Sequence, residues 1–510
     1  MKYKRIISRL DVKGGNVVKG VHFECLRVIG KPQELAKEYY LQGADELVYI
    51  DIVANLYQRQ NLLNIVNKAS EHVFIPFTIG GGVRNTEDIR ALLHLGADKV
   101  AINTAATKNP ELVHEAAHMF GSQCIVISIE AQRKDDGSYE VFTDNGRMST
   151  GLEVVSWAKK VERLGAGEIL LTSVEREGTQ QGLDIELIKE VSTAVSIPVI
   201  ASGGVGNPAN ILDCFLSTQA SAVATASLLH YKKSDIEQIK HTLVDAGVMI
   251  RKTKDPKRVE IEDTDYDIAD YNKYTKQHLT MDDDTQTNVP SSEEPDAPIG
   301  IIDYGINNVK SVLKAFRQIG KQSCIVTKPK DLTSIQVMVL PGVGSFGEGM
   351  QTLKNLGLVE AIRKEALKGK PILGICLGMQ MLFSMSEEFG VHQGLDLIKG
   401  RITKLKAPAQ VEDSNYRLPH IGWNQLQIGM QKWKNTMLNQ IQESDLVYFV
   451  HSYYPVVQNN KEIVATTHYG NQEFCVVVQR GNVTGTQFHP EKSGKAGLRI
   501  LAGFCEQYGI

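Results

Sequence analysis

The sequence has none of the features that place a protein in a membrane, in an oxidising compartment or on nucleic acid. Its seven cysteines are odd in number and widely spaced, with no C-x-x-C pair of the kind that holds zinc or forms a redox disulfide. The longest nearly apolar run, residues 371–383, is too short to cross a bilayer. The 56 lysine and arginine residues almost balance the 59 acidic residues, so no basic excess favours nucleic acid or an anionic membrane surface. We therefore expect neither of these partners.

The start of the chain also lacks an apolar stretch. MKYKRIISRLDVKGG has a charged residue every few positions and does not resemble a secretion signal, so we expect a cytoplasmic protein. A composition of 42% hydrophobic and 23% charged residues is ordinary for a globular protein. A length of 510 residues predicts more than one domain.

One segment has almost no aliphatic periodicity and separates two regions that do. Residues 253–298 contain 13 acidic and 5 basic side chains, a net charge of −8, with proline and serine near the end. Such a composition is typical of a solvated linker. The rest of the chain then carries +5, a mild bias that suits anionic substrates. We predict one domain at residues 1–252, a flexible linker at 253–298 and a second domain at 299–510.

Eight short β-rich runs alternate with amphipathic helical patterns in the first region. They lie at residues 6–12, 47–53, 76–81, 99–104, 124–131, 168–174, 198–204 and 221–227. Eight β-α units in about 250 residues are typical of a (β/α)8 TIM barrel. FTIGGGVRNTEDIRALLHLGADKVAINTA is also similar to VIASGGVGNPANILDCFLSTQASAVATAS, with an offset of 122 residues. The pattern therefore predicts a barrel of two duplicated halves.

The predicted strands end in glycine and small polar residues, at the face where TIM barrels carry their chemistry. These residues are Gly81, Gly82, Asn103 and Thr104 in the first half, and Gly203, Gly204 and Ser227 in the second. Glycine lets backbone N–H groups approach a phosphate closely. A Gly-Gly pair can also serve only as a tight turn, but two pairs at symmetric positions favour a long ligand with a phosphate at each end.

Charged residues mark both faces of the predicted barrel. Asp11 ends the first strand and Glu130 ends the fifth, so the two carboxylates could act as general acid and general base if their surroundings separate their pKa values. The alternative for either is a helix cap or an ion-pair partner. At the opposite face the strands begin with Arg5, Glu46, Lys99 and Glu168. Residues at that face normally serve stability, which favours a structural charge ring.

Five motifs of this region resemble the cyclase subunit of imidazole glycerol phosphate synthase: DVKGGNVVKGVHFE, FTIGGGVR, DKVAINTAA, GAGEILLTSVEREGT and IASGGVG. The resemblance covers nearly all of residues 1–252. It implies that Asp11 and Glu130 stand at the acid–base positions, and that Lys19 and Gly178 lie at the substrate. It further implies that the two glycine cradles are phosphate sites, and that the ring of four charges is a gate through which ammonia enters the barrel.

Four positions depart from that family's pattern. Glu130 stands where the family has Asp, the family's D-R-D-G-T reads E-R-E-G-T at residues 175–179, and Arg9 replaces the usual Cys. Glutamate is longer than aspartate by one methylene, which is enough to move a catalytic oxygen by about an ångström.

The second region alternates IGIIDYG, VMVLPGVG and PILGICLG with helical patterns, which predicts a doubly wound α/β domain. Within it, a strand followed by Gly-Ile-Cys376-Leu-Gly and a helical run has the form of a nucleophile elbow. Taken alone, a cysteine between glycines is more often a packing residue. Downstream, QFHPEKSG supplies His489 to accept the thiol proton and Glu491 to orient the imidazole, which favours a Cys-His-Glu triad.

This region resembles the class I glutamine amidotransferases, through DYGINNVKSV, LPGVGSFGEGM, GICLGMQ, PHIGWN, YFVHSYY and QFHPEKSG. The resemblance spans residues 299–510. It implies that Cys376 attacks the carboxamide of L-glutamine and releases ammonia. The backbone of Leu377 and of the Gly342-Val343-Gly344 segment would hold the oxyanion, and Gln380 would help to bind glutamine.

The two resemblances together imply one coupled reaction. Glutamine and a bis-phosphorylated ribonucleotide would give imidazole glycerol phosphate, aminoimidazole carboxamide ribonucleotide and glutamate, with the two domains docked within one chain. No residue cluster calls for a metal or an organic cofactor, and we expect none. The sequence is also compatible with two other functions. A paralogous amidotransferase could deliver ammonia to another phosphosugar or nucleotide-sugar in surface glycan biosynthesis, and a non-catalytic protein could sense the ribonucleotide.

Overall fold

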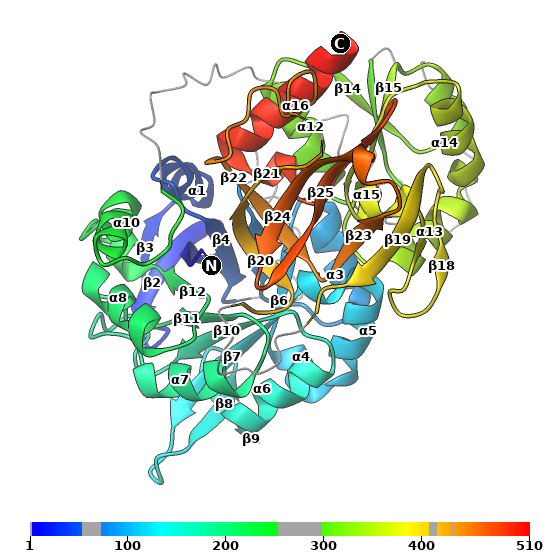
Figure 1. Ribbon diagram of the computed structural model, residues 1–510. Coiled ribbons are helices and arrows are strands. Elements are labelled where there is room, and N and C mark those ends of the chain that lie inside the picture. The colour runs from blue at the N-terminus through cyan, green and yellow to red at the C-terminus, as the bar shows by residue number, and fades with distance from the viewer. Residues whose placement is uncertain (1–2, 54–72, 253–297, 306, 407–415, 431) are drawn as a thin grey trace.

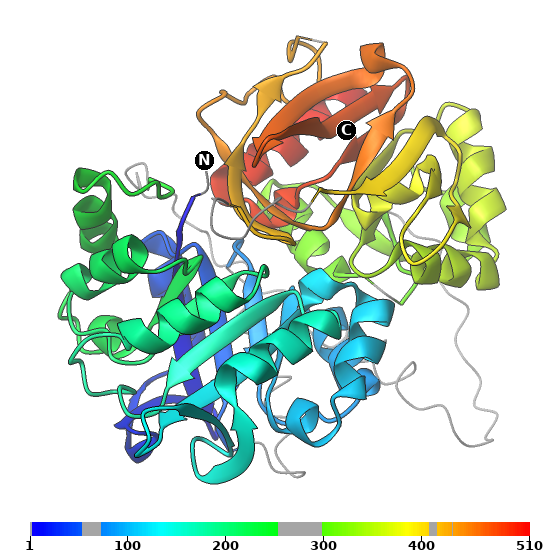
Figure 2. The same ribbon diagram turned by 60° about the horizontal axis from the view of Figure 1, so that its bottom comes forward.

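The computed structural model describes residues 3–53, 73–252, 298–305, 307–406, 416–430 and 432–510. A barrel and a separate sheet-and-helix domain lie side by side (Figures 1 and 2). Except for Pro298, the segment predicted to be a linker lies outside the described residues, so its assignment stays a prediction. None of the helices in the described residues is long and apolar enough to cross a membrane.

Eight parallel strands close the barrel, which confirms the predicted fold. They are β1 (Arg5–Lys13), β4 (Glu46–Asp51), β5 (Phe77–Gly80), β6 (Lys99–Ile102), β7 (Ile125–Arg133), β10 (Glu168–Ser173), β11 (Val199–Ser202) and β12 (Ala222–Thr225). Each pairs with the next in this order, and β12 pairs back to β1. The strands match all eight predicted runs because branched apolar residues dominate them and both of their faces are buried.

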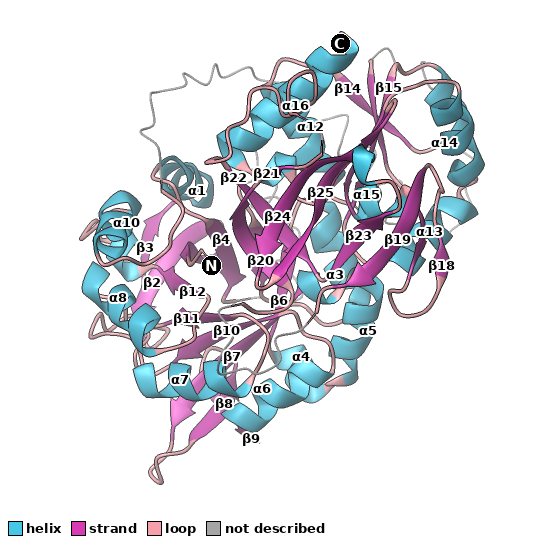
Figure 3. Ribbon diagram, viewed as in Figure 1, coloured by secondary structure: helices cyan, strands magenta, loops and turns pink. Residues whose placement is uncertain are grey.

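Helices cover the outside of the barrel (Figure 3). They are α1 (Pro32–Leu41), α3 (Thr86–His94), α4 (Thr104–Lys108), α5 (Glu111–Phe120), α6 (Val154–Arg163), α7 (Ile185–Ala194), α8 (Pro208–Ser217), α9 (Ser227–His230) and α10 (Ile236–Asp245). Side chains of Asn85, Asp184 and Asn207 cap α3, α7 and α8. A small apolar cluster fills the interior, with Ile7, Val126 and Leu170 among its members.

Two antiparallel hairpins extend the barrel beyond its carboxyl-end face. The first is β2 (Asn16–Val21) with β3 (Glu24–Gly30), and the second is β8 (Tyr139–Thr143) with β9 (Met148–Glu153). The first hairpin carries Lys19 over the barrel mouth. The second carries the turn that holds Gly146, which contacts Glu130.

The second domain is built on an eight-stranded mixed sheet. Its parallel strands, in spatial order, are β14 (Ser323–Val326), β13 (Ile299–Ile302), β15 (Val337–Gly342), β16 (Ile372–Cys376) and β26 (Val483–Thr486). The sheet continues antiparallel through β25 (Gln472–Arg480), β24 (Ile463–Tyr469) and β21 (Gln427–Ile428). The parallel half confirms the predicted α/β fold, whereas the antiparallel half was not anticipated.

Smaller sheets and five α-helices complete the described part of this domain. Strands β18 (His392–Gln393), β17 (Phe383–Ser386), β19 (Ile398–Lys404) and β23 (Tyr453–Val457) form one sheet, and β20 (His420–Gln425) pairs with β22 (Leu446–His451). The helices are α12 (Val309–Gln318), α13 (Phe346–Asn355), α14 (Leu358–Leu367), α15 (Leu377–Met381) and α16 (Gly494–Tyr508).

The second domain docks on the face where the barrel strands begin. Lys492 pairs with Asp98 at 2.7 Å, just before β6, and both side chains are buried. The indole N–H of Trp423 donates to the carbonyl of Asp45 at 3.2 Å, just before β4. Arg417 donates to the carbonyl of Ser192 at 2.7 Å, at the end of α7. The two domains therefore share a buried polar boundary at the bottom of the barrel.

Candidate active sites

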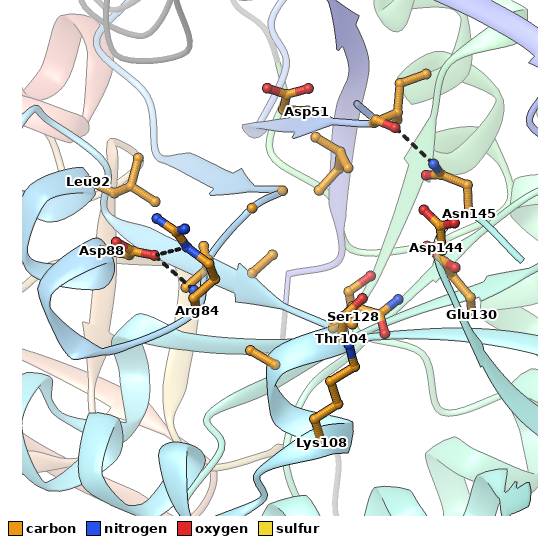
Figure 4. Close-up of a pocket in the computed structure, with 18 of the residues that line it drawn as sticks. Asp51, Arg84, Asp88, Leu92, Thr104, Lys108, Ser128, Glu130, Asp144 and Asn145 are labelled. Atoms are coloured by element: carbon orange, nitrogen blue, oxygen red, sulfur yellow. Dashed lines mark hydrogen bonds and ion pairs between the residues drawn. The ribbon is translucent and has the colours of Figure 1, made fainter. Parts of the chain in front are cut away.

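A cavity of about 540 Å³ lies at the carboxyl ends of the first-half strands (Figure 4). Five predicted residues line it: Gly81, Gly82, Asn103, Thr104 and Glu130. In the close-up, Glu130, Asp144 and Asn145 lie on one wall, and Arg84 lies across the cavity from them. The structure thus brings the first cradle and one predicted acid–base residue into one space.

In each cradle, one glycine stands where no other residue would fit. Gly81 has a φ of +100°, and a Cβ there would lie 2.2 Å from the carbonyl oxygen of Asp51. Gly204, in the second cradle, has a φ of +98°, and its Cβ would lie 2.2 Å from the carbonyl oxygen of Gly182. Both turns therefore combine a left-handed backbone with close backbone contact.

Glu130 is a buried carboxylate with few partners. It is 9% exposed, and its Oε2 accepts a hydrogen bond from the backbone N–H of Gly146 at 2.8 Å. Burial raises the pKa of Glu130 to about 7, against the hydrogen bonds from Gly146 and Asn103. Its proton can therefore be exchanged near neutral pH, as a general acid or base requires.

The second cradle lines a separate, narrower cavity. Five of the residues predicted to bind the substrate line it: Lys19, Gly178, Gly203, Gly204 and Ser227. Arg9 and Glu177 also line this cavity. The two cradles thus stand at two different parts of the barrel mouth, as a ligand with two phosphates would need.

Asp11 is held by two cations, Arg9 and Lys19, that both line this second cavity. Its Oδ1 accepts from Arg9 Nε at 2.9 Å, and its Oδ2 accepts from Lys19 Nζ at 2.9 Å. Lys19 makes a further short contact to Glu177. Burial would raise the pKa of Asp11, but the charges of Arg9 and Lys19 outweigh it and hold the pKa well below its usual range.

The four charges at the opposite face form a closed ring. Arg5 contacts Glu46 and Glu168 at 2.6 Å each, and Lys99 contacts the same two carboxylates at 2.8 and 2.6 Å. All four side chains are fully buried. Tyr448 of the second domain is close enough for the charges of Glu46 and Arg5 to affect its phenol. The ring therefore closes the barrel toward the docked domain.

Cys376 sits at a strained turn between β16 and α15. Its φ is +53°, a conformation that non-glycine residues rarely adopt. The flanking glycines are sterically required, because a Cβ on Gly378 would lie 1.7 Å from the carbonyl oxygen of Leu340, and one on Gly374 would lie 2.7 Å from the backbone of Met379. This is the geometry predicted for a nucleophile elbow.

His489 lies in the same cavity as Cys376 and is oriented by Glu491. Its Nδ1 is 2.7 Å from Glu491 Oε1, and its Nε2 has no hydrogen-bond partner among the described residues. Burial would lower the pKa of His489, but the charges of Cys376 and Glu491 raise it well above its usual range. These surroundings favour a protonated imidazole, which can give its proton to a leaving group.

Most of the residues predicted to bind glutamine line this cavity. Val343, Gly344, Leu377 and Gln380 do so, and Gly342 pairs with Cys376 on the neighbouring strand. The amide of Gln380 donates to the carbonyl of Tyr453 at 3.0 Å and to Gln487 at 3.1 Å, so it also braces the wall of the cavity.

Several lining residues were not found from the sequence. The nucleophile's cavity also contains Glu388 and His451, together with Asp98, Gln123 and Cys124 from the barrel. Burial raises the pKa of Glu388 to about 7. Asp51, Arg84 and Lys108 also line the cavity in the barrel mouth. Asp51 could have been predicted because it ends a strand, whereas Arg84 and Lys108 do not lie at a strand end. Among the described residues, no group of three or more His, Cys, Asp or Glu side chains could hold a metal ion.

Comparison with known proteins assigns both halves of the chain. Residues 5–235 match the family model "Histidine biosynthesis protein", and residues 300–507 match "Glutamine amidotransferase class-I". The first half is 61% identical over 206 residues to an imidazole glycerol phosphate synthase subunit HisF from Legionella pneumophila, covering 97% of that protein and 40% of this chain.

Two more relatives with the same name are nearly as similar. The protein from Methanopyrus kandleri is 50% identical over 266 residues, with 98% of it and 49% of this chain covered. The protein from Alkaliphilus metalliredigens is 49% identical over 249 residues, with 99% of it and 49% of this chain covered. The chain therefore belongs to the imidazole glycerol phosphate synthase family, with a HisF-type cyclase barrel and a class I glutamine amidotransferase domain in one polypeptide.

Proposed function

We propose that the chain is a bifunctional imidazole glycerol phosphate synthase of histidine biosynthesis. The amidotransferase domain hydrolyses glutamine, and the barrel uses the ammonia to convert phosphoribulosyl formimino aminoimidazole carboxamide ribonucleotide. The products are imidazole glycerol phosphate, aminoimidazole carboxamide ribonucleotide and glutamate. Both family matches, and identities of 49–61% to HisF proteins, support this function over a paralogue for another phosphosugar.

At the glutaminase site, Cys376 is the nucleophile. Its sulfur attacks the glutamine carboxamide, and His489, held by Glu491 at 2.7 Å, gives a proton to the leaving ammonia. The backbone N–H groups of Leu377 and of Val343 or Gly344, which line the same cavity, hold the oxyanion. We add Glu388 to the predicted set, because a buried carboxylate in this cavity suits the ammonium group of glutamine.

Ammonia then enters the barrel through the ring of Arg5, Glu46, Lys99 and Glu168. The ring stands between the two sites, and its four ion pairs close the direct path. Passage requires at least one pair to separate. Because all four charges are buried, breaking one pair is costly, and this suits a gate that opens only transiently.

At the other face, the two glycine cradles hold the two phosphates of the ribonucleotide. Lys19 and Gly178 belong to the second cradle, and Asn103 and Thr104 belong to the first. This places the reacting part of the substrate between Asp11 and Glu130. The pKa of Asp11 is lowered and the pKa of Glu130 is raised. Asp11 therefore serves as a fixed anion, and Glu130 serves as the group that transfers protons.

One observation supports the proposal: the cavity with Cys376 and His489 and the mouth with the two glycine turns lie at opposite ends of one barrel, with a ring of four buried charges between them. We also place the protein in the cytoplasm. All seven cysteines, the nucleophile included, are free thiols, which suits a reducing compartment.

The direct test is to incubate the purified chain with glutamine and the ribonucleotide. Imidazole glycerol phosphate, aminoimidazole carboxamide ribonucleotide and glutamate should form in equal amounts. Glutamine hydrolysis without any imidazole product would reject the cyclase function and leave the paralogue as the better account.

A further inference from the structure

Arg9 is a buried cation in the barrel mouth, at a position where the sequence departs from the family pattern. It lies on β1 and is 3% exposed. Its Nη1 donates to Thr172 at 3.0 Å on β10 and to Ser202 at 3.1 Å on β11, and its guanidinium lies 5.5 Å from the ring of Phe23. Contacts to two other strands and one aromatic ring leave this side chain little freedom to move.

The remaining contact of Arg9 is to Asp11. Arg9 Nε binds one carboxylate oxygen and Lys19 Nζ binds the other, each at 2.9 Å. Lys19 is shared with Glu177, so the cluster holds two cations and two anions, all at most 4% exposed. If Arg9 were neutral, Lys19 alone would have to compensate two buried carboxylates.

Glu130, across the barrel, has no such cation in contact among the residues that the structure describes. Its hydrogen bonds come from neutral groups, the backbone N–H of Gly146 and the side chain of Asn103. The charged groups that face it from other elements are Arg9, at longer range, and Asp144. The groups that face Asp11 are Arg9, Lys19, Glu177 and, from α9, His230. The two carboxyls therefore differ in their cationic partners.

We propose that Arg9 is a positioning residue that fixes Asp11 as a permanent anion, so that Glu130 alone exchanges protons with the substrate. The proposal rests on the cyclase function given above. Attack by ammonia places positive charge on the reacting nitrogen, and a fixed anion stabilises that charge without taking the proton. Glu130 then accepts the proton and later returns one to a departing nitrogen, which restores its starting state.

The proposed roles of Asp11 and Glu130 predict how the activity of Arg9 variants depends on pH. Arg9 and Lys19 hold the pKa of Asp11 low against burial, so wild-type Asp11 stays charged throughout the working range. When Arg9 is replaced by a neutral residue, burial and the nearby Glu177 raise the pKa of Asp11. Such a variant loses the anion as the pH falls, in addition to any change at Glu130.

The test compares Arg9→Gln with Arg9→Lys in the full chain, with saturating ammonium chloride as nitrogen source. We expect Arg9→Gln to lower kcat at least tenfold at pH 6 and clearly less at pH 8.5, with the KM for the ribonucleotide changed less than threefold. Arg9→Lys keeps the charge and should recover most of the loss at pH 6. An equal loss at both pH values, or a change confined to KM, would overturn the proposal.

A second measurement needs no turnover. In protein labelled with 13C at the aspartate carboxyls, the Asp11 signal, assigned with Asp11→Asn, should not titrate between pH 5 and 9 in the wild type. It should titrate in that range in Arg9→Gln. A titrating wild-type Asp11 would overturn the role of Arg9. A wild type that never cyclises the ribonucleotide would instead reject the proposed function, so the two failures are distinguishable.

Discussion

At the residue scale, Cys376 and Glu130 are buried polar groups whose surroundings set their chemistry. Cys376 has a positive φ that the two flanking glycines make possible, and its partner His489 is held as an acid by two negative charges. Glu130 is buried with hydrogen bonds from neutral donors, which suits a group that must hold and release a proton. Each residue serves one half of the reaction, so each half can be removed separately.

Replacing Cys376 should separate the two activities. Cys376→Ala removes the only nucleophile for glutamine but leaves the barrel mouth unchanged, so glutamate release should fall at least a thousandfold while ammonia-dependent cyclisation persists. Product assays with glutamine or ammonium chloride measure both. Cys475→Ala, at another buried cysteine, is the matched control and should keep both activities. Loss of ammonia-dependent turnover in folded Cys376→Ala would refute the assignment.

Replacing Glu130 should abolish cyclisation and raise stability. Glu130→Gln cannot exchange the proton, so ammonia-dependent kcat should fall at least a hundredfold with ribonucleotide binding nearly intact, whereas Glu130→Asp should keep substantial activity. Because burial raises the folded-state pKa of Glu130 to about 7, the folded chain binds more protons than the unfolded chain, and stability falls as pH rises from about 4.5 to 7.

Glu130→Gln removes this cost, which amounts to on the order of 3 kcal/mol above pH 7. Its melting temperature should therefore exceed that of the wild type at pH 8 and match it near pH 4.5. Thermal unfolding at the two pH values measures the difference. Equal melting temperatures at pH 8 would mean that Glu130 is ionised in the folded protein at no cost.

At the scale of elements, the eight barrel strands and the elbow were predictable because their signals are local. Branched apolar runs define the strands, and Gly-x-Cys-x-Gly defines the turn at Cys376. The hairpins β2–β3 and β8–β9 were not predicted, since their polar residues serve the barrel mouth rather than a core. Two partners of Arg9, Thr172 and Ser202, come from strands far from it in the sequence, and Glu388 has no local motif. Only the folded chain brings these residues together.

The first cradle should not tolerate a methyl group. Gly81→Ala places a Cβ 2.2 Å from the carbonyl of Asp51, so the turn must move by about an ångström from its phosphate-binding position. The KM for the ribonucleotide should rise at least tenfold. Gly15→Ala is the control, because Gly15 also has a positive φ, +83°, but no atom within 4 Å of its Cβ position. Equal effects of the two variants would show that backbone strain, and not the cradle, is responsible.

At the scale of the whole molecule, the docked domains must pass ammonia without losing it to solvent. The boundary is held by buried polar contacts such as Lys492 with Asp98 and Arg417 with Ser192. The glutaminase cavity itself includes Gln123 and Cys124 of the barrel, so the site is complete only when the domains are docked. Coupling should therefore depend on residues that touch neither substrate.

Arg417 offers a test of this coupling. Its guanidinium donates to Ser192, Val195 and Gln219 of the barrel, and Arg417→Ala removes all three contacts. At about 1 kcal/mol or more per hydrogen bond, the docked state should weaken by several kcal/mol. The amount of imidazole product per glutamine hydrolysed should then fall below one. Arg499→Ala, which breaks a pair between the exposed Arg499 side chain and the buried Asp445 within the amidotransferase domain and touches no barrel residue, should leave this ratio unchanged.

The most direct test of the account follows the nitrogen itself. The purified chain is supplied with the ribonucleotide, with glutamine labelled with 15N at the amide, and with excess unlabelled ammonium chloride at a pH that keeps solvent ammonia scarce. The account predicts imidazole glycerol phosphate with 15N in the ring at far above the fraction of label in the total ammonia pool. Label at the pool fraction would show that ammonia reaches the barrel mouth through solvent, and the absence of any imidazole product would contradict the cyclase function itself.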